Sequence, residues 1–330
     1  MAPVTSAGTT RSPAPRPPPS PPTRVTLAGT DPRRHPVLRF LPSRSARPAK
    51  EWLIFVAASP WFLTSETAPG ATPAADRADD SRTRVYCFPH AGGNPRTFLD
   101  WQAGMGVDGR IFAVCPPGRG HRFREPAAAT VAELADGAAL AIALDAAPDR
   151  PFVLFGHSFG AALAFEVARR LDGVPGLAAL VASGCSAPSL LPTPRVVEAA
   201  RLEGRRFTEA VGFFGGLPPE VLQDEAMQEL LLPHLKADFA MVAGYQYRPA
   251  GPLRVPLTLL NGIDDPHVTT ASLAPWAREC PGEPTRHWVD GGHFYFEGRP
   301  HTVTDVLRPL ARAARREAAT PARDEYVELI

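Results

Sequence analysis

A short apolar run that leads straight into a glycine-framed pentapeptide, and then into a helical stretch, constrains the fold of this chain most. Phe152–Phe155 has the pattern of a buried strand, Gly156-His157-Ser158-Phe159-Gly160 follows without a gap, and Ala161–Leu171 has the composition of a helix. The two glycines permit a turn so sharp that it holds the serine hydroxyl up at the carboxyl edge of a sheet. The pentapeptide alone is weak evidence, but its place between strand and helix makes Ser158 a predicted nucleophile.

Short apolar runs alternate with longer helical stretches between residues 83 and 316. Several runs are continuously apolar, which is typical of strands buried on both faces of a parallel sheet. Helices are expected between them and at the end of the domain. The pattern predicts an α/β fold, a mostly parallel sheet with helices on both faces, and the serine turn indicates its α/β-hydrolase form. The predicted strands and helices are Val85–Phe88, Ile111–Cys115, Phe152–Phe155, Leu177–Ala182, Leu257–Leu260 and Arg286–Val289, with helices at Ala132–Ala146, Ala161–Leu171 and Thr302 to about Arg316.

A serine hydroxyl needs a general base, and the chain has nine histidines. His293 fits best, because it follows the predicted strand Arg286–Val289 and an Asp-Gly-Gly turn, from which a loop can reach over the sheet edge to Ser158. Five rival histidines have contexts typical of a strand interior, of the variable position in the pentapeptide or of a surface: His157, His287, His121, His234 and His301.

The imidazole must be held in one tautomer by an acid, and in this fold the chain order is nucleophile, acid, base. The strand Leu257–Leu260 and the loop Asn261-Gly262-Ile263-Asp264-Asp265-Pro266 lie between Ser158 and His293. Both aspartates of this loop are candidates. We expect Asp265 to be the acid, with Asp264 as the alternative if the loop is one residue out of register.

The first 50 residues differ sharply from the rest of the chain. They hold twelve prolines and nine Lys or Arg against one acid, Asp31, a charge of +8, whereas residues 51–330 carry 26 basic and 33 acidic residues, a charge of −7. Proline-rich chain with few large apolar side chains cannot offset the entropy lost on folding. We expect residues 1–82 to be a disordered extension and linker, 83–316 the domain and 317–330 a tail. The arginines suit either a docking arm for an acidic partner or a solvated tail.

The apolar stretch Trp52–Leu63 is too short to span a bilayer, which takes ~20 residues, and it is broken by Pro60. No secretory signal pattern precedes it. The cysteines, Cys87, Cys115, Cys185 and Cys280, lie far apart, so neither a zinc cluster nor a redox pair is indicated. We therefore expect a cytoplasmic protein with free thiols, no metal, and no membrane or nucleic-acid partner.

Five ordered blocks of the chain resemble the type II thioesterases, the stand-alone editing enzymes of nonribosomal peptide and polyketide synthases. The resemblance covers about residues 84–310. The five blocks are Cys87-Phe88-Pro89-His90-Ala91-Gly92-Gly93, Pro116-Pro117-Gly118-Arg119-Gly120, the serine turn with its helix, Leu231 to Tyr247 at the position where the family has a lid helix, and Gly292-His293-Phe294. The resemblance implies that the triad is Ser158, Asp265 and His293.

The resemblance also implies an oxyanion hole made by the backbone N–H groups of Ala91 and Phe159. Two departures from the family pattern stand out. Ile263 replaces the first aspartate of a Gly-Asp-x-Asp-Pro motif, which leaves Asp265 in place. Phe159 replaces the usual methionine, and its stiff ring can narrow the acyl pocket while leaving its N–H unaffected.

The activity implied is hydrolysis of acyl or aminoacyl thioesters on the phosphopantetheine arm of acyl or peptidyl carrier proteins, through an acyl-Ser158 intermediate. No cofactor is required, and a monomer is expected. A helical lid is expected at about residues 186–247, where Leu231, Leu235, Phe239 and Val242 form one apolar stripe that can face either the core or the substrate.

Two other interpretations remain open. An esterase or lipase acting on free oxygen esters has the same triad and differs in pocket and partner. A catalytically silent interaction protein on the same fold is disfavoured by the complete set of Ser158, Asp265 and His293.

Overall fold

Six of the seven strands in the central sheet are parallel, and all six were predicted from the sequence. The structure, a computed structural model, describes residues 59–65, 81–146, 150–215, 217, 221 and 223–320. The strand order is β1-β3-β2-β4-β5-β6-β7, and β1 alone is antiparallel. The strands are β1 (Phe62–Leu63), β2 (Thr83–Phe88), β3 (Gly109–Val114), β4 (Phe152–His157), β5 (Leu177–Ser183), β6 (Leu257–Gly262) and β7 (Thr285–Val289).

Strand β1 corrects the predicted extent of the N-terminal extension. Residues 59–65 were assigned to a disordered segment, but Phe62 pairs with Val114 and Leu63 with Ala113 on the edge strand β3. The side chains of Phe62 and Leu63 are 6% and 8% exposed. Part of the apolar stretch Trp52–Leu63 therefore packs in the domain. Of the predicted extension and linker, residues 1–58 and 66–80 lie outside the described residues.

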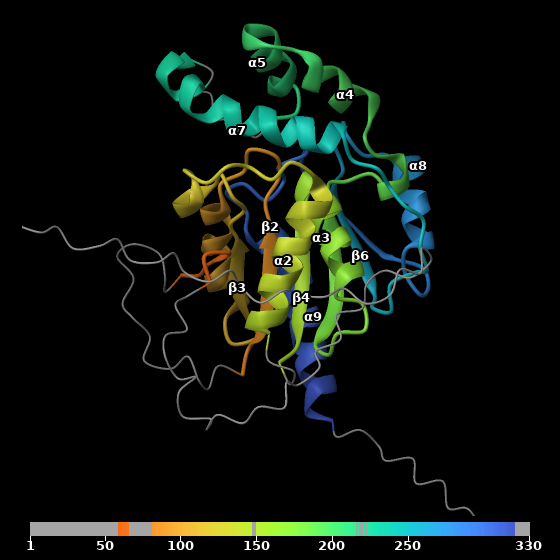
Figure 1. The fold of residues 1–330 in the computed structure, drawn as a ribbon. Helices are drawn as coiled ribbons and strands as arrows, with labels where there is room; N and C mark the ends of the chain where they lie inside the picture. The colour runs from red at the N-terminus through yellow and green to blue at the C-terminus, as the bar shows by residue number, and fades with distance from the viewer. Residues whose placement is uncertain are drawn as a thin grey trace, which may run out of the picture. The chain divides into compact units, whose positions relative to one another are not determined.

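Alternate residues of the central strands point to opposite faces of the sheet, and a separate core forms on each face. Tyr86 and Leu154 belong to the core under α2 (Val131–Asp145) and α3 (Phe159–Arg170). Cys87 and Phe155 belong to the core under α9. Helices thus cover both faces (Figure 1), which confirms the predicted layers.

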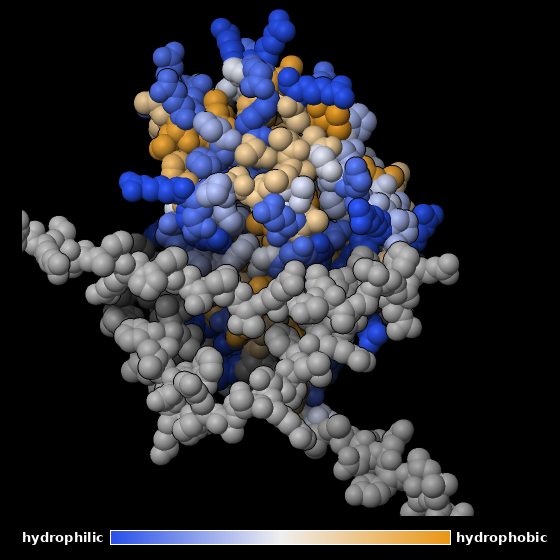
Figure 2. Space-filling view, viewed as in Figure 1, coloured by the Kyte–Doolittle hydropathy of each residue, from blue (hydrophilic) through white to orange (hydrophobic). Residues whose placement is uncertain are grey.

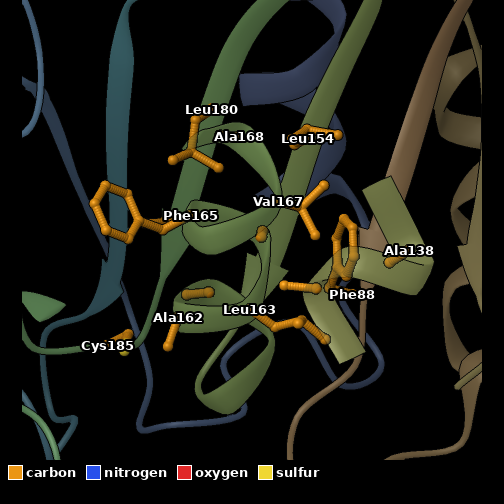
Figure 3. Packing of buried hydrophobic residues seen from close by; sticks show 14 of the residues in the cluster. Phe88, Ala138, Leu154, Ala162, Leu163, Phe165, Val167, Ala168, Leu180 and Cys185 are labelled. Carbon is orange, nitrogen blue, oxygen red and sulfur yellow. The ribbon is translucent and has the colours of Figure 1, made fainter. Parts of the chain in front are cut away.

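Helix α3 packs closely against the central strands of the sheet. Its side chains interleave with Leu154 of β4 and Leu180 of β5, and Phe165 is fully enclosed (Figure 3). Burying a side chain of this size contributes ~1.5–3 kcal/mol. This packing fixes the first turn of α3, and hence Ser158, against the end of β4.

Helix α9 (His301–Ala319) closes the other face with Val303, Leu307 and Ala311. It runs three residues beyond Arg316, so the domain extends past the predicted boundary; residues 321–330 lie outside the described part. No helix in the described part of the chain is both long enough and apolar enough to cross a bilayer. The shorter elements are η1 (Pro95–Trp101), α1 (Gln102–Met105), η2 (Gly120–Arg122), η3 (Pro188–Leu190), α8 (Thr270–Leu273) and η4 (Ala274–Arg278).

Between β5 and β6 the chain inserts helices α4 (Pro194–Arg201), α5 (Gly204–Gly212) and α7 (Glu225–Ala243). They lie beyond the carboxyl end of the sheet (Figure 1). The helix predicted at Leu231–Tyr247 begins six residues earlier, where the Asp224 side chain accepts a hydrogen bond from the Met227 N–H and caps it, and it ends before Tyr247.

The outer surface of these helices mixes charged and apolar side chains (Figure 2). Four of the large apolar residues exposed in the described chain lie between β5 and β6, namely Leu190, Phe213, Met227 and Leu230.

Candidate active site

Ser158 lies at the turn from β4 into α3. It is the one non-glycine residue with positive φ among those described, at φ 55°. It occupies the N-cap of α3, yet its side chain accepts no capping hydrogen bond. Its N–H is instead bound to the Ser183 carbonyl oxygen at 2.8 Å. Such a backbone conformation costs ~1–3 kcal/mol, and it leaves the hydroxyl free at the sheet edge.

The two glycines of the pentapeptide are required by close contact. A Cβ on Gly156 would lie 2.0 Å from the Gly160 carbonyl oxygen, and a Cβ on Gly160 would lie 2.1 Å from the Phe88 carbonyl oxygen. Real Cβ atoms essentially never approach another atom so closely. The turn can therefore press against β2 only with glycine at both positions.

Asp265 and His293 are hydrogen-bonded to each other. The Nδ1–H of His293 donates to Asp265 Oδ2 at 2.7 Å, and Asp265 Oδ1 accepts from the His267 N–H at 2.8 Å. Asp265 is 6% exposed and His293 8%. A buried carboxylate with two donors is well suited to hold the imidazole in one tautomer.

Main-chain hydrogen bonds fix the register that distinguishes Asp265 from Asp264. The Ile263 N–H donates to the Val289 carbonyl at 2.9 Å, and the Asp264 N–H donates to the Gly291 carbonyl at 3.0 Å. These bonds tie the loop after β6 to the turn before His293. The Asp264 side chain is exposed, whereas that of Asp265 turns inward.

A cavity of about 270 Å³ opens at Ser158 and His293. Its walls are mostly apolar, and they combine the sheet edge with the inserted helices. Helix α7 contributes Leu235, Phe239 and Val242, which are three of the four residues in the predicted apolar stripe. The same three side chains also pack in the cores, so they both line the cavity and hold α7 in place. The other apolar lining residues are Ala91, Phe159, Leu191, Val196, Val211, Phe214, Leu217, Pro266 and Phe294.

Two residues that line the cavity with Ser158 have free backbone amides. Phe159 is the first residue of α3, where N–H groups have no intrahelical acceptor. In the loop after β2, the Gly92 and Gly93 amides are bound to Asp238 and to the His90 carbonyl. The Ala91 N–H has no acceptor within the described part of the chain, and Ala91 lines the cavity. Free amides at such a position can stabilise an oxyanion.

Three further histidines surround His293, and sequence analysis did not place any of them there. The rings of His157 and His267 each lie 4.7 Å from that of His293, centroid to centroid, and His90 lies 6.1 Å from His157. Burial and neighbouring His293 lower the pKa of His90 to about 3 and that of His267 to about 4, and burial lowers the pKa of His157. These rings are neutral near pH 7.

His157 begins a buried hydrogen-bonded chain. Its Nδ1 lies 2.8 Å from Ser183 Oγ, which lies 2.6 Å from the Tyr295 hydroxyl. From the sequence, His157 was expected only to fill the variable position of the pentapeptide. Only its proximity to polar residues on two other segments reveals this role, and no short motif carries that information.

Asp265, His267 and His293 could together offer three ligand atoms, all within 4.8 Å of one another, to a metal ion. The bond between His293 Nδ1 and Asp265 Oδ2 already occupies two of these side chains. The pairing suits a general base and its acid at least as well as it suits metal ligation.

Comparison with known proteins gives consistent matches. The thioesterase domain family matches residues 83–312. Thioesterase PikA5 of Streptomyces venezuelae is 34% identical over 232 residues, 70% of this chain and 81% of that protein. The solved structure of the RedJ thioesterase from the prodiginine pathway of Streptomyces coelicolor is 31% identical, with a TM-score of 0.64, and the match covers 72% of this chain and 91% of that one.

A third relative has a different name. Linear gramicidin dehydrogenase LgrE of Brevibacillus parabrevis is 31% identical over 240 residues, 69% of this chain and 87% of that protein. A dinucleotide-binding Gly-x-Gly-x-x-Gly turn runs from a strand into a helix. The single such spacing in this chain, Gly104–Gly109, runs from α1 into β3, the opposite order. The architecture, the geometry at the cavity and the match over residues 83–312 agree: the chain belongs to the thioesterase family of α/β-hydrolase fold enzymes.

Proposed function

We propose that the enzyme hydrolyses acyl thioesters borne on the phosphopantetheine arm of carrier proteins, with Ser158 as nucleophile, His293 as base and Asp265 as the acid that orients it. One observation carries the assignment of roles. His293 is hydrogen-bonded to buried Asp265 and lines the same apolar cavity as Ser158. The backbone of Ser158 is strained, and its side chain makes no capping hydrogen bond.

The reaction proceeds in two steps. Ser158 Oγ attacks the thioester carbonyl while its proton passes to His293, and collapse of the tetrahedral intermediate releases the carrier-bound thiol, which takes up that proton. His293 then removes a proton from water, the resulting hydroxide attacks the acyl-serine, and the free acid leaves with Ser158 reprotonated. The amides of Ala91 and Phe159 stabilise the oxyanion in both steps, each by ~3 kcal/mol.

The cavity suggests the kind of acyl group that is removed. A volume of about 270 Å³ with apolar walls suits a small or medium apolar acyl chain rather than a full-length product. The ring of Phe159 lies in this wall beside the nucleophile. The inserted helices act as a lid in this proposal, because α7 supplies one side of the cavity.

The carrier-protein partner is supported by relatives that are named as thioesterases, one of them from a named biosynthetic pathway. PikA5 is named a thioesterase, and RedJ is described as a thioesterase of the prodiginine pathway. The arm belongs to the partner, so the enzyme brings no prosthetic group of its own. We place the reaction in the cytoplasm with a monomeric enzyme, and the four free buried cysteines are consistent with a reducing compartment.

Hydrolysis of free oxygen esters is the alternative, and the same triad would perform it. Intact-mass measurement of an acetyl- or propionyl-loaded carrier protein, incubated with wild type or with Ser158→Ala, separates the two. We expect the acyl mass to disappear with wild type only. Retention of the acyl group with both enzymes, while wild type still cleaves a p-nitrophenyl ester, would favour the free-ester hydrolase.

A further inference from the structure

A second buried carboxylate lies close to the cavity but outside the triad. Asp238 of α7 is 7% exposed, and the triad chemistry does not use it. Its Oδ2 accepts a hydrogen bond from the Gly92 N–H at 2.7 Å and forms an ion pair with the Arg119 guanidinium. One oxygen atom thereby joins three segments that are distant in sequence: α7, the loop after β2 and the loop after β3.

Arg119 is itself held firmly. It is 8% exposed, its Nη1 donates to the Gly118 carbonyl at 2.9 Å, and its Nη2 donates to the His234 carbonyl at 3.2 Å. Burial raises the pKa of Asp238, and the Arg119 charge and the Gly92 N–H act against that rise. Because buried ion pairs gain little over well-packed apolar residues, seating α7 does not by itself call for one. What a carboxylate adds is a directed acceptor for the Gly92 amide.

The loop that carries Gly92 is pinned against α7. Gly92 has φ +72°, and a Cβ there would lie 2.7 Å from Leu235 Cδ1. The next amide, of Gly93, donates to the His90 carbonyl at 2.9 Å. With Gly92 and Gly93 both bound, the orientation of the preceding peptide unit is restricted. That unit carries the Ala91 N–H, which borders the cavity next to Ser158.

Building on the function proposed above, we propose that Asp238 is a positioning residue for the oxyanion hole: held by Arg119, it binds the Gly92 amide and so aims the neighbouring Ala91 N–H at the reacting carbonyl. It acts through Gly92 and Ala91 and does not touch the substrate. Because Asp238 belongs to α7, the oxyanion donor is in place only while that helix is seated on the loop. The Arg119 turn and the loop after β2, two blocks outside the triad, thereby gain a shared role.

The test removes the acceptor while keeping the helix seated. The double variant Arg119→Met/Asp238→Leu replaces the ion pair by an apolar pair and leaves the Gly92 N–H without its partner. Asp238→Asn keeps an acceptor oxygen, and Glu229→Gln changes an exposed carboxylate on the same helix. For each, kcat and KM on a soluble thioester, the rate of fluorophosphonate labelling and Tm are measured, with kcat normalised to labelled active sites.

Loss of a whole oxyanion donor lowers kcat ~10²–10³-fold, so a misaimed one should lower it ~10–100-fold in the double variant. The labelling rate should fall in parallel, with KM within about twofold, since the donor acts in the transition state. Glu229→Gln should stay within about threefold of wild type, and Asp238→Asn, which keeps an acceptor for the Gly92 N–H, should lose less kcat than the double variant. A double variant that is well folded and keeps wild-type kcat and labelling rate would overturn the proposal.

If the double variant does not fold, Asp238→Glu decides the matter. It retains the charge but displaces the carboxylate by one methylene, so kcat should drop several-fold at unchanged KM, and wild-type kcat would reject the positioning role. A wild-type enzyme that neither labels nor cleaves thioesters would refute the proposed function instead. The two failures are therefore distinguishable.

Discussion

The loops at the sheet edge and the inserted helices form opposite walls of one cavity, but they are held in different ways. Main-chain contacts fix the sheet edge: the Ser158 N–H binds the Ser183 carbonyl, and the Ile263 N–H binds the Val289 carbonyl. Side chains fix the insertion: Phe207 and Phe239 pack in its own small core, with ring centroids 5.7 Å apart.

This difference separates the position of the triad from the shape of the cavity. A geometry set by backbone hydrogen bonds tolerates changes in most neighbouring side chains, so the triad is buffered against substitution. A wall built from packed side chains changes shape whenever one of them changes. The insertion can therefore be altered to admit other acyl groups while Ser158, Asp265 and His293 stay in place.

The largest expected effect lies at the sheet edge. Asp265→Asn should lower kcat on a thioester by ~10⁴-fold, because the amide favours the wrong tautomer of His293. Asp264→Asn, one residue away and exposed, should stay within about twofold. Steady-state kinetics on both purified variants measures the contrast, and the reverse ranking would show that the register of this loop is misassigned.

A change in the insertion should act on selectivity instead. Phe239→Leu shortens a cavity-lining side chain of α7, so the ratio of kcat/KM for a longer to a shorter acyl chain should rise about tenfold, the scale of one or two methylenes in an apolar pocket. The kcat for an acetyl thioester should change by less than about threefold. An equal loss on all chain lengths would mean that Phe239 supports the reacting groups rather than the fit of the acyl chain.

His267 follows β6 at the sheet edge and packs against Phe214 of the insertion. Protonation of His267 at low pH should therefore weaken the packing between the two walls of the cavity. Its ring stacks on Phe214 at 5.1 Å and contacts His293, and its pKa is lowered to about 4. Between about pH 4 and 6.5 the unfolded chain therefore binds the proton more readily, so the stabilisation is complete above pH 6.5 and is lost as pH falls towards 4. Tm should fall over this range, and less steeply in His267→Phe, which keeps the stack. Identical slopes of Tm against pH in wild type and His267→Phe would show that His267 does not cause the loss of stability in acid.

The smallest effect on turnover is expected at the N-terminus. Removing residues 1–58 should leave both Tm and kcat unchanged, whereas removing residues 1–65 also deletes β1. Burial of Phe62 and Leu63 contributes ~1.5–3 kcal/mol each, so the longer deletion should lower Tm by ~5–15 °C at nearly unchanged kcat. Thermal melts of the two truncations measure this, and equal Tm values would show that β1 adds nothing to stability.

Short sequence motifs predicted most of the candidate residues at the carboxyl edge of the sheet. Gly-x-Ser-x-Gly between strand and helix, Asp-Pro after β6 and a Gly-Gly turn before His293 are short-range signals, and together they predicted Ser158, Asp265 and His293 as the triad. The structure adds what no short-range signal contains: β1 is only two residues long, and Asp238 meets Gly92 across 146 positions of sequence. The start of α7 was predicted six residues too late, because the capping role of Asp224, which accepts from the Met227 N–H, was not considered.

The central claim is that Ser158, activated by His293, is the nucleophile at this cavity. Labelling the full-length enzyme with a fluorophosphonate, followed by peptide mass mapping, tests it most directly. The account predicts one adduct, on the peptide containing Ser158, which is absent from Ser158→Ala and strongly reduced in His293→Ala. An adduct on another residue, or undiminished thioester hydrolysis by Ser158→Ala, would contradict it.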